Sequence, residues 1–246
     1  MRPAGRHVGG ACVMQTVFVC GGRGTRLIPR EAGPKSLVRL GGSSLLSRLV
    51  AFVGGFHRSK KPPVVIIDAR DEQTPQALRQ LLPDACVVRQ GDPDGVANTL
   101  ILAQPNLDDV VLVSLGDLFL DGTLSRILIG PGLVFWKAAP LVELRKNFGI
   151  TIGSDGIVSR VIEKPVNSRG LNCGMGLYVL NRSIIDCFAH APVNSRTGER
   201  GITAALHTAI EMGVSFRAIP FSGYYNNVNS HADVDAVERH LARKTG

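Results

Sequence analysis

Short, nearly continuous apolar runs alternate with amphipathic segments in the first half of the chain, and this alternation most constrains the fold. The apolar runs span residues 16–20, 63–68, 85–89 and 110–115. Such β-branched runs are typical of strands buried on both faces of a parallel sheet. The amphipathic segments between them span 43–53, 74–82 and 95–104. Strands alternating with helices predict βαβ crossovers, and Pro75 after Thr74 predicts that Thr74 caps the second helix.

The pattern changes after residue 117, where strands and turns replace the regular alternation. Predicted strands span 132–138, 148–152, 157–163, 177–180 and 214–220, and predicted helices span 181–188, 202–212 and 232–243. The turn-rich segment 153–156 predicts a β-hairpin. The sequence therefore predicts a Rossmann-like α/β fold. We expect a mixed, mostly parallel sheet, covered by helices on both faces, in a single domain.

The composition excludes several classes of protein. A chain of 246 residues that is 44% hydrophobic is not disordered, and no apolar run reaches the length of a membrane span. The five cysteines form no C-x-x-C pair and no Cys/His cluster, so we expect neither a disulfide framework nor a zinc site. A reducing cytoplasm is therefore the default location. The net charge of +8 suits small polyanions, and the scattered basic residues predict no nucleic-acid partner.

The N-terminal segment has basic residues but lacks the apolar stretch of a secretory signal. We expect a disordered leader over residues 1–14 and a folded domain over 15–246. Translation could start at Met1 or at Met14. The sequence leaves open whether copies of the chain form a homo-oligomer.

A glycine-rich loop, GGRGTRL over residues 21–27, directly follows the first predicted strand. Its glycines let backbone N–H groups approach phosphate oxygens, and Arg26 supplies a fixed fork of donors. A dinucleotide-binding loop would need a third glycine where Leu27 stands, and a P-loop would need a Gly-Lys-Ser/Thr ending. An ordinary strand-to-helix turn is the alternative. The candidate nucleotide-binding residues of this loop are Gly21, Gly22, Gly24 and Thr25.

Two charged residues further along the chain are candidates for the same site. Lys35 lies in a P-K-S-L segment after the glycine loop, where it could neutralise a second anion. Asp117 follows the buried run 110–115, as the second residue of a Gly-Asp pair. Ligands of open α/β sheets lie beyond the carboxyl ends of the strands, so we expect Asp117 to project into the binding crevice. A solvated loop lysine and a turn aspartate are the alternatives, and Asp121 could serve as the turn aspartate.

The ordered motifs G-x-G-T-R-L, P-K-x-L and Gly-Asp resemble those of the sugar-1-phosphate nucleotidyltransferase family, especially its glucose-1-phosphate thymidylyltransferase-like members. The family transfers a nucleotidyl group from a nucleoside triphosphate to a sugar 1-phosphate with Mg²⁺ and releases pyrophosphate. The resemblance implies a nucleotide-binding half over about 15–120 and a sugar-phosphate-binding half over about 121–246. The catalytic residues that it implies are Arg26, Lys35, Asp117 and Lys164.

The resemblance extends to loops that would recognise the two substrates. The segment Q-x-x-P-x-G-x-A over 90–97 is similar to the family's base-recognition loop and implies that Gln90 and the Gly95 backbone bind the base. A helix N-terminus is the alternative there. The F-G-I segment at 148–150 and the E-K-P segment at 163–165 match the family's sugar-phosphate motifs. The sugar-phosphate-binding residues implied are Gly149, Glu163, Lys164, Asn172 and Gly176.

The last motif departs most from the family, which usually places an aspartate there to complete the metal site. Asn227 stands at that position, and Asn229 fits members with an asparagine or an acid-x-acid ending. An amide oxygen can coordinate Mg²⁺ but adds no negative charge. We expect Asp117, with Asn227 or Asn229, to hold Mg²⁺, and a simple turn is the alternative.

Two further functions remain open at this stage. Acid-x-acid endings also occur in nucleotidyltransferases that act on a non-sugar phosphate such as phosphocholine. The lost acid at Asn227 also permits a non-catalytic regulatory relative that binds nucleotide sugars.

Overall fold

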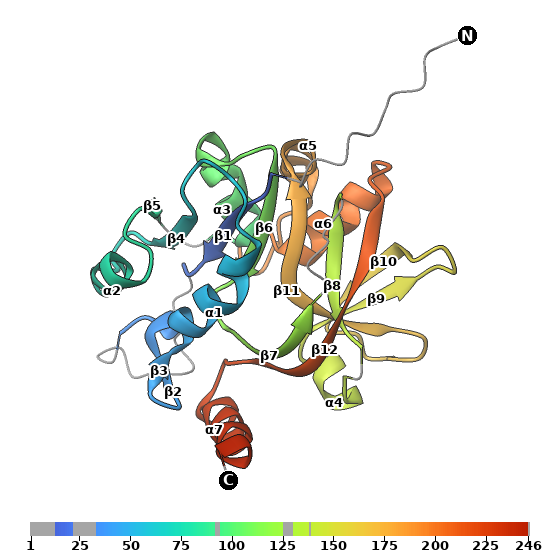
Figure 1. The fold of residues 1–246 in the computed structure, drawn as a ribbon. Helices are drawn as coiled ribbons and strands as arrows, with labels where there is room; N and C mark the ends of the chain where they lie inside the picture. Colours follow the sequence, from blue (N-terminus) through green and yellow to red (C-terminus); the bar gives the residue numbers. More distant parts are fainter. Residues whose placement is uncertain (1–12, 22–32, 92–93, 125–129, 138, 246) are drawn as a thin grey trace.

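Strand β1 (Gln15–Val19) lies inside the larger sheet, and all of its residues are buried. It pairs in parallel with β4 (Val64–Asp68) and β6 (Val110–Leu115), and β4 pairs in parallel with β5 (Cys86–Gln90). Figure 1 shows this arrangement in a computed structural model that describes residues 13–21, 33–91, 94–124, 130–137 and 139–245. The first half of the chain therefore forms the parallel part of the sheet, as its continuous apolar runs predict.

The second half extends the same sheet with mainly antiparallel pairs, in the order β5-β4-β1-β6-β11-β8-β12-β10-β9, with β7 beside β12. Its strands are β7 (Leu118–Leu124), β8 (Gly132–Trp136), β9 (Phe148–Ile152), β10 (Ile157–Glu163), β11 (Asn172–Asn181) and β12 (Phe216–Asn227). Among them, only β8 and β12 pair in parallel. Strands β9 and β10 pair antiparallel across a short turn, so the predicted hairpin is present. The mixed α/β fold is confirmed.

Helices cover both faces of the sheet, as predicted. One buried cluster receives residues from α1 (Leu45–Val53), α2 (Gln73–Leu81), α4 (Leu141–Leu144) and α7 (His231–Thr245). The other receives residues from α3 (Val96–Ala103), α5 (Arg182–Cys187) and α6 (Ile202–Glu211). A small two-stranded sheet, β2 (Arg39–Leu40) and β3 (Ser43–Ser44), precedes α1. Within the described residues, no helix is both long and apolar enough to cross a membrane.

Three details differ from the predictions. Strand β7 was not predicted, because Asp121 and Gly122 interrupt its apolar pattern, yet it pairs with β12 along its whole length. Strands β11 and β12 are longer than predicted. Thr74 does not cap α2: the helix begins one residue earlier, and Asp71 Oδ1 accepts hydrogen bonds from the backbone N–H groups of Gln73 and Thr74.

The predicted leader lies mostly outside the described residues. Its last residue, Met14, is an exception, because it is only 5% exposed and belongs to a core cluster. The backbone N–H of Arg58 donates to the Met14 carbonyl at 2.8 Å. The packed part of the chain therefore already includes Met14.

Candidate functional site

The turn between β6 and β7 places Asp117 at the carboxyl end of the parallel strands. Gly116 makes this possible, since a Cβ there would lie 2.8 Å from Cys20 Sγ and 2.9 Å from the Val19 carbonyl oxygen. Its N–H donates to that carbonyl at 2.8 Å, so the end of β6 lies directly against the end of β1. The backbone N–H of Val228 donates to the Asp117 carbonyl at 2.8 Å. The turn that carries Asp117 is therefore held from two sides, by Val19 and by Val228.

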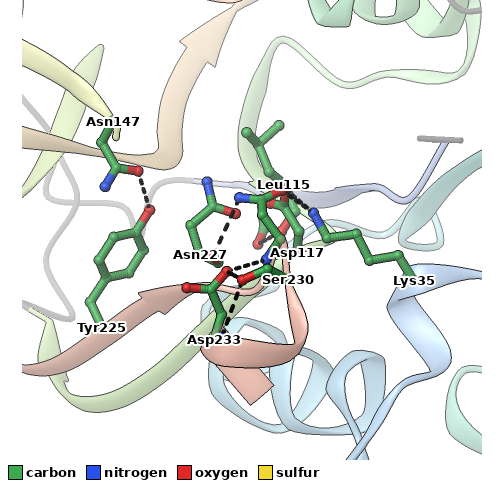
Figure 2. A network of polar contacts seen from close by, with 10 residues as sticks. Lys35, Leu115, Asp117, Asn147, Tyr225, Asn227, Ser230 and Asp233 are labelled. Atoms are coloured by element: carbon green, nitrogen blue, oxygen red, sulfur yellow. Dashed lines mark hydrogen bonds and ion pairs between the residues drawn. The ribbon is translucent and has the colours of Figure 1, made fainter. Parts of the chain in front are cut away.

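Lys35 makes an ion pair with Asp117 in this structure (Figure 2). Its Nζ donates to Asp117 Oδ2 at 2.8 Å and to Asn229 Oδ1 at 2.5 Å. The side chains of Lys35 and Asp117 are 14% and 24% exposed. Lys35 lies in the short 3₁₀ helix Lys35–Leu37, 82 residues before Asp117 in the chain. Two segments that the sequence singled out separately thus meet in a partly buried contact.

Asn227, the last residue of β12, lies against the same carboxylate. The amide atom nearest to Asp117 is 2.9 Å from Oδ2 and 3.2 Å from Oδ1, and hydrogen bonding is satisfied when this atom is the nitrogen. With the amide turned over, two oxygens would lie 2.9 Å apart. Neighbouring oxygen ligands of an octahedral Mg²⁺, bound at about 2.1 Å, are separated by about 3 Å. Asp117 and Asn227 therefore fit two adjacent positions around a hard cation.

Asp233 orders the turn that carries Asn229. Its Oδ2 accepts hydrogen bonds from the Asn229 backbone N–H at 3.0 Å and from Ser230 Oγ at 2.7 Å. The Asp233 backbone N–H donates to Ser230 Oγ at 3.3 Å, which completes a reciprocal cap at the start of α7. Asp233 was not among the residues predicted from the sequence, although the Ser-x-x-Asp spacing is a capping-box signal.

A cavity of about 620 Å³ opens beside this cluster. Asn227, Asn229 and Asp233 line it together with Glu163 and Lys164. Asp117 contacts Asn227, and Lys35 contacts Asn229, but neither Asp117 nor Lys35 is among the described residues that line the cavity. The cavity therefore joins two of the predicted metal residues, Asn227 and Asn229, to three of the predicted sugar-phosphate residues, Glu163, Lys164 and Gly176.

Glu163 and Lys164 are held loosely on their side of the cavity. Glu163 Oε2 accepts a hydrogen bond from Thr203 Oγ1 at 2.6 Å, and its Oε1 lies 3.6 Å from Lys164 Nζ. The side chains of Glu163 and Lys164 are 57% and 62% exposed. Lys164 has a φ of +42°, a region that non-glycine residues adopt at a cost. The backbone N–H of Lys164 donates to the Asn147 carbonyl at 3.0 Å, which helps to hold this conformation.

Asn147 connects the Lys164 turn to β12. Its Oδ1 accepts a hydrogen bond from the Tyr225 hydroxyl at 3.1 Å (Figure 2). Burial raises the pKa of Tyr225 well above its usual value, so the hydroxyl stays protonated and donates. The Tyr225 ring lies at 5.6 Å, edge to face, from that of Trp136, whose Nε1 donates to the Gly223 carbonyl at 2.8 Å. This buried network fixes one wall of the cavity.

A second lysine lines the cavity near Asn147. Lys146 Nζ lies 3.0 Å from Glu143 Oε1, and this hydrogen bond raises the pKa of Lys146. Its side chain is 56% exposed. Lys146 was not predicted from the sequence, because a lysine beside a short helix has the same local pattern as a solvated surface charge.

The predicted base-recognition residues lie next to the start of the glycine loop. A Cβ on Gly21 would lie 3.2 Å from Gln90 Oε1. Gln90 is 4% exposed, and its amide accepts from Thr99 Oγ1 at 2.7 Å and donates to Asp94 Oδ1 at 3.2 Å. Gly95 has a φ of +100°, and a Cβ there would meet the Arg200 carbonyl oxygen at 2.3 Å. Both residues therefore have structural roles as well.

The remaining predicted residues lie in different places. Gly176 lines the cavity, whereas Gly149 and Asn172 are not among the described residues that line it. The space beside Gly149 is occupied by protein, since a Cβ would lie 2.9 Å from Leu171 Cδ1. Asn172 begins β11 opposite Ile150. The predicted loop residues Gly22, Gly24, Thr25 and Arg26 lie outside the described residues.

The described part of the chain has no group of three or more His, Cys, Asp or Glu residues placed to hold a metal ion. A metal at Asp117 would therefore depend on amide oxygens, as the sequence predicts. Lysines, a carboxylate and amides meet beside this cavity, near the carboxyl ends of the parallel strands. This set of charged and hydrogen-bonding groups defines a class of site suited to phosphate ligands.

The comparisons with known proteins agree with this class. Residues 15–243 match the family described as Nucleotidyl transferase. The chain therefore belongs to the nucleotidyl transferase family, a family of enzymes.

Relatives and solved structures are similar over most of the chain. "UTP--glucose-1-phosphate uridylyltransferase AglF" of Haloferax volcanii is 26% identical over 94% of this chain and 98% of its own. "Bifunctional protein GlmU" of Methanocaldococcus jannaschii is 25% identical over 94% of this chain, which spans only 55% of that relative. A UDP-glucose pyrophosphorylase complexed with UDP-glucose has a TM-score of 0.75 at 17% identity, covering 94% of this chain and 99% of its own. That structure supports the fold.

Proposed function

We propose that this chain transfers a nucleotidyl group from a nucleoside triphosphate to a sugar 1-phosphate in a Mg²⁺-dependent reaction. The products would be a nucleoside diphosphate sugar and pyrophosphate. The observation that carries the proposal is the cavity that Asn227 and Asn229 share with the Glu163–Lys164 pair. The same two asparagines contact the Lys35–Asp117 pair. Two lysines from distant segments suit a reaction in which two polyanions must meet.

The chemistry requires charge neutralisation and alignment. An oxygen of the sugar phosphate attacks the α-phosphorus in line, and the bond from that phosphorus to the pyrophosphate oxygen breaks. Lys35 and Arg26 would hold the phosphates that leave, and Lys164 would hold the attacking phosphate. No covalent bond to the protein is needed, so catalysis consists of positioning and electrostatic stabilisation.

Asp117 with Asn227 or Asn229 would hold the metal. When bound, Mg²⁺ neutralises charge on the phosphates and polarises their oxygens. Asp117 and Asn227 fit adjacent metal ligands by distance, whereas Asn229 Oδ1 is engaged by Lys35. This favours Asn227 as the second ligand.

The names of two relatives support sugar 1-phosphates as the substrate class. One is the glucose-1-phosphate uridylyltransferase of Haloferax volcanii, and the other is a glucose-1-phosphate thymidylyltransferase of Streptomyces antibioticus, which is 26% identical over 92% of this chain and 65% of its own. They differ in the base, so the nucleobase and the sugar stay open. We also propose a cytoplasmic reaction, because the four described cysteines Cys20, Cys86, Cys173 and Cys187 are free thiols.

A pyrophosphate-release screen tests the proposal. The four ribonucleoside triphosphates and dTTP would be combined with a panel of sugar 1-phosphates, with and without Mg²⁺. We expect release with at least one pair, only with metal, and its loss in Asp117→Asn. Phosphocholine in the same panel tests the non-sugar alternative. If no pair releases pyrophosphate while the protein still binds nucleotide sugars, the proposal is overturned in favour of a regulatory role.

A further inference from the structure

The contact between Lys35 and Asp117 has a consequence for metal binding that goes beyond the proposed reaction, although it rests on the metal site of the proposed function. The Lys35 ammonium donates to Asp117 Oδ2, the same oxygen that lies nearest to the Asn227 amide. Its second bond goes to Asn229 Oδ1. One ammonium therefore contacts the candidate carboxylate ligand and one of the two candidate amide ligands.

The charges of Lys35 and of the three candidate metal ligands cancel. Asp117 contributes one negative charge, Lys35 one positive charge, and the two asparagines none. Since Asn227 stands where the family usually places an acid, a single ammonium neutralises the whole candidate ligand set. Hard cations gain affinity from ligand charge, so a neutralised set attracts a free dication weakly.

Burial strengthens the electrostatic interaction between Lys35 and Asp117. The Lys35 and Asp117 side chains are 14% and 24% exposed, so salt and water screen their contact less than that of a surface pair. A dication entering beside an ammonium that remains on Asp117 Oδ2 would be repelled at short range. A triphosphate offers the ammonium other anionic partners and brings negative charge to the metal.

We propose that Lys35 is the resident counter-ion of Asp117, so that the site rejects free divalent cations and accepts metal together with the triphosphate. Lys35 thus sets the order of binding as well as contacting phosphate. The structure offers a matched control in Lys146, which lines the adjoining cavity but pairs with Glu143 instead of Asp117.

The test is Mn²⁺ binding to the whole chain without nucleotide, measured by the electron paramagnetic resonance signal of free Mn²⁺. Lys35→Met should tighten Mn²⁺ binding at least about tenfold, equivalent to about 1.4 kcal/mol. Lys35→Arg, which keeps the charge, should bind as weakly as the unmodified protein. Lys146→Met should shift the affinity less than about twofold, because an exposed charge that does not touch Asp117 has little effect on it.

A double variant locates the metal. Adding Asp117→Asn to Lys35→Met should abolish the tightened binding. Equal affinities in Lys35→Met and the unmodified protein would overturn the proposal, as would equal tightening in Lys146→Met. If circular dichroism shows Lys35→Met to be unfolded, Lys35→Gln replaces it under the same criteria.

This experiment separates the counter-ion from the reaction. If the unmodified protein releases pyrophosphate but Lys35→Met binds Mn²⁺ no more tightly, only the counter-ion role of Lys35 is refuted. If Lys35→Met binds Mn²⁺ more tightly but no substrate pair releases pyrophosphate, the proposed reaction is refuted and the counter-ion role of Lys35 is retained.

Discussion

Two of the lysine–carboxylate pairs at this site differ in distance, in exposure and in their separation along the chain. Lys35 and Asp117 lie 2.8 Å apart with side chains 14% and 24% exposed. Lys164 and Glu163 lie 3.6 Å apart with side chains 62% and 57% exposed. The first pair joins segments far apart in the chain, whereas the second consists of neighbours at the end of β10.

The difference indicates which pair is preorganised. A short, partly buried contact keeps its geometry before any ligand arrives, and removing one partner leaves the other charge poorly solvated. An exposed pair at 3.6 Å contributes little to stability and can reorganise around a ligand. We therefore expect the Lys35 pair to control turnover and the Lys164 pair to control substrate affinity.

The largest effect is expected at Lys35. Lys35→Ala should lower kcat/KM by about 10²–10³-fold, the usual loss of one group that stabilises developing charge. Circular dichroism should remain native, because Lys35 belongs to a three-residue 3₁₀ turn and not to a core strand. Lys60→Ala, at an exposed position, is the control in the same pyrophosphate assay. A rate unchanged by Lys35→Ala would remove Lys35 from the site.

Lys164→Ala should act mainly on sugar-phosphate affinity. We expect the KM for the sugar phosphate to rise about tenfold and the KM for the nucleotide to change less than about twofold, since one charge–phosphate contact is lost. High salt should reduce the difference, because exposed charges are screened. Lys164→Arg should retain most of the affinity. Equal losses for both substrates would show that Lys164 is misassigned.

The two asparagines can be distinguished by magnesium titration of pyrophosphate release. An aspartate at the true ligand should lower the half-saturating Mg²⁺ concentration several-fold, because ligand charge raises the affinity for hard cations. The geometry favours Asn227→Asp for this effect and predicts a smaller change for Asn229→Asp. Alanine at the true ligand should raise the same concentration. If none of the four variants shifts the titration, neither asparagine binds metal.

A smaller effect is expected from Asp233, which positions Asn229 through its backbone. Asp233→Ala should lower the free energy of unfolding by about 1 kcal/mol, the usual contribution of a helix cap. It should also raise the half-saturating Mg²⁺ concentration, which loss of a cap alone would not do. Asp235→Ala, exposed on the same helix, is the control in urea unfolding and in the assay. An unchanged Mg²⁺ titration in Asp233→Ala would limit Asp233 to a structural role.

The smallest effect concerns Asp121, which the structure places away from Lys35. Burial alone would raise the pKa of Asp121, but hydrogen bonds from Lys244 and His240 outweigh it and hold the pKa below 3.8. A carboxyl group whose pKa is lower in the folded than in the unfolded protein stabilises the fold at every pH above its unfolded pKa. This stabilisation is lost as the pH falls below 3.8 and through the lower pKa of the folded protein. Asp121→Asn should lower the free energy of unfolding by up to about 1 kcal/mol at pH 7. If Asp121→Asn lowers the free energy of unfolding as much at pH 3 as at pH 7, this account is wrong.

The sequence predicted the parallel half well, because continuous apolar runs bounded by helices have few alternative interpretations. It predicted less of the antiparallel half. Strand β12 continues through Pro220 and Gly223, and β7 through Asp121, because pairing between the two strands outweighs these local signals. Register between distant strands is a property of the packed sheet and has no local signature.

The candidate site was predictable where motifs stand in order along the chain. Lys35, Asp117, Asn227 and Asn229 were all singled out, and the structure brings them together. The sequence did not predict that Lys35 pairs with Asp117, because that contact spans 82 residues. The roles of these residues in catalysis stay predictions until the variants are measured.

The network behind Asn147 also provides an optical probe. Trp136 is the only tryptophan of the chain, and it is 9% exposed against the ring of Tyr225. The Tyr225 hydroxyl donates a hydrogen bond to Asn147, which lines the cavity. A ligand that displaces Asn147 changes the surroundings of this single indole, so its fluorescence emission reports occupancy of the cavity without any added label.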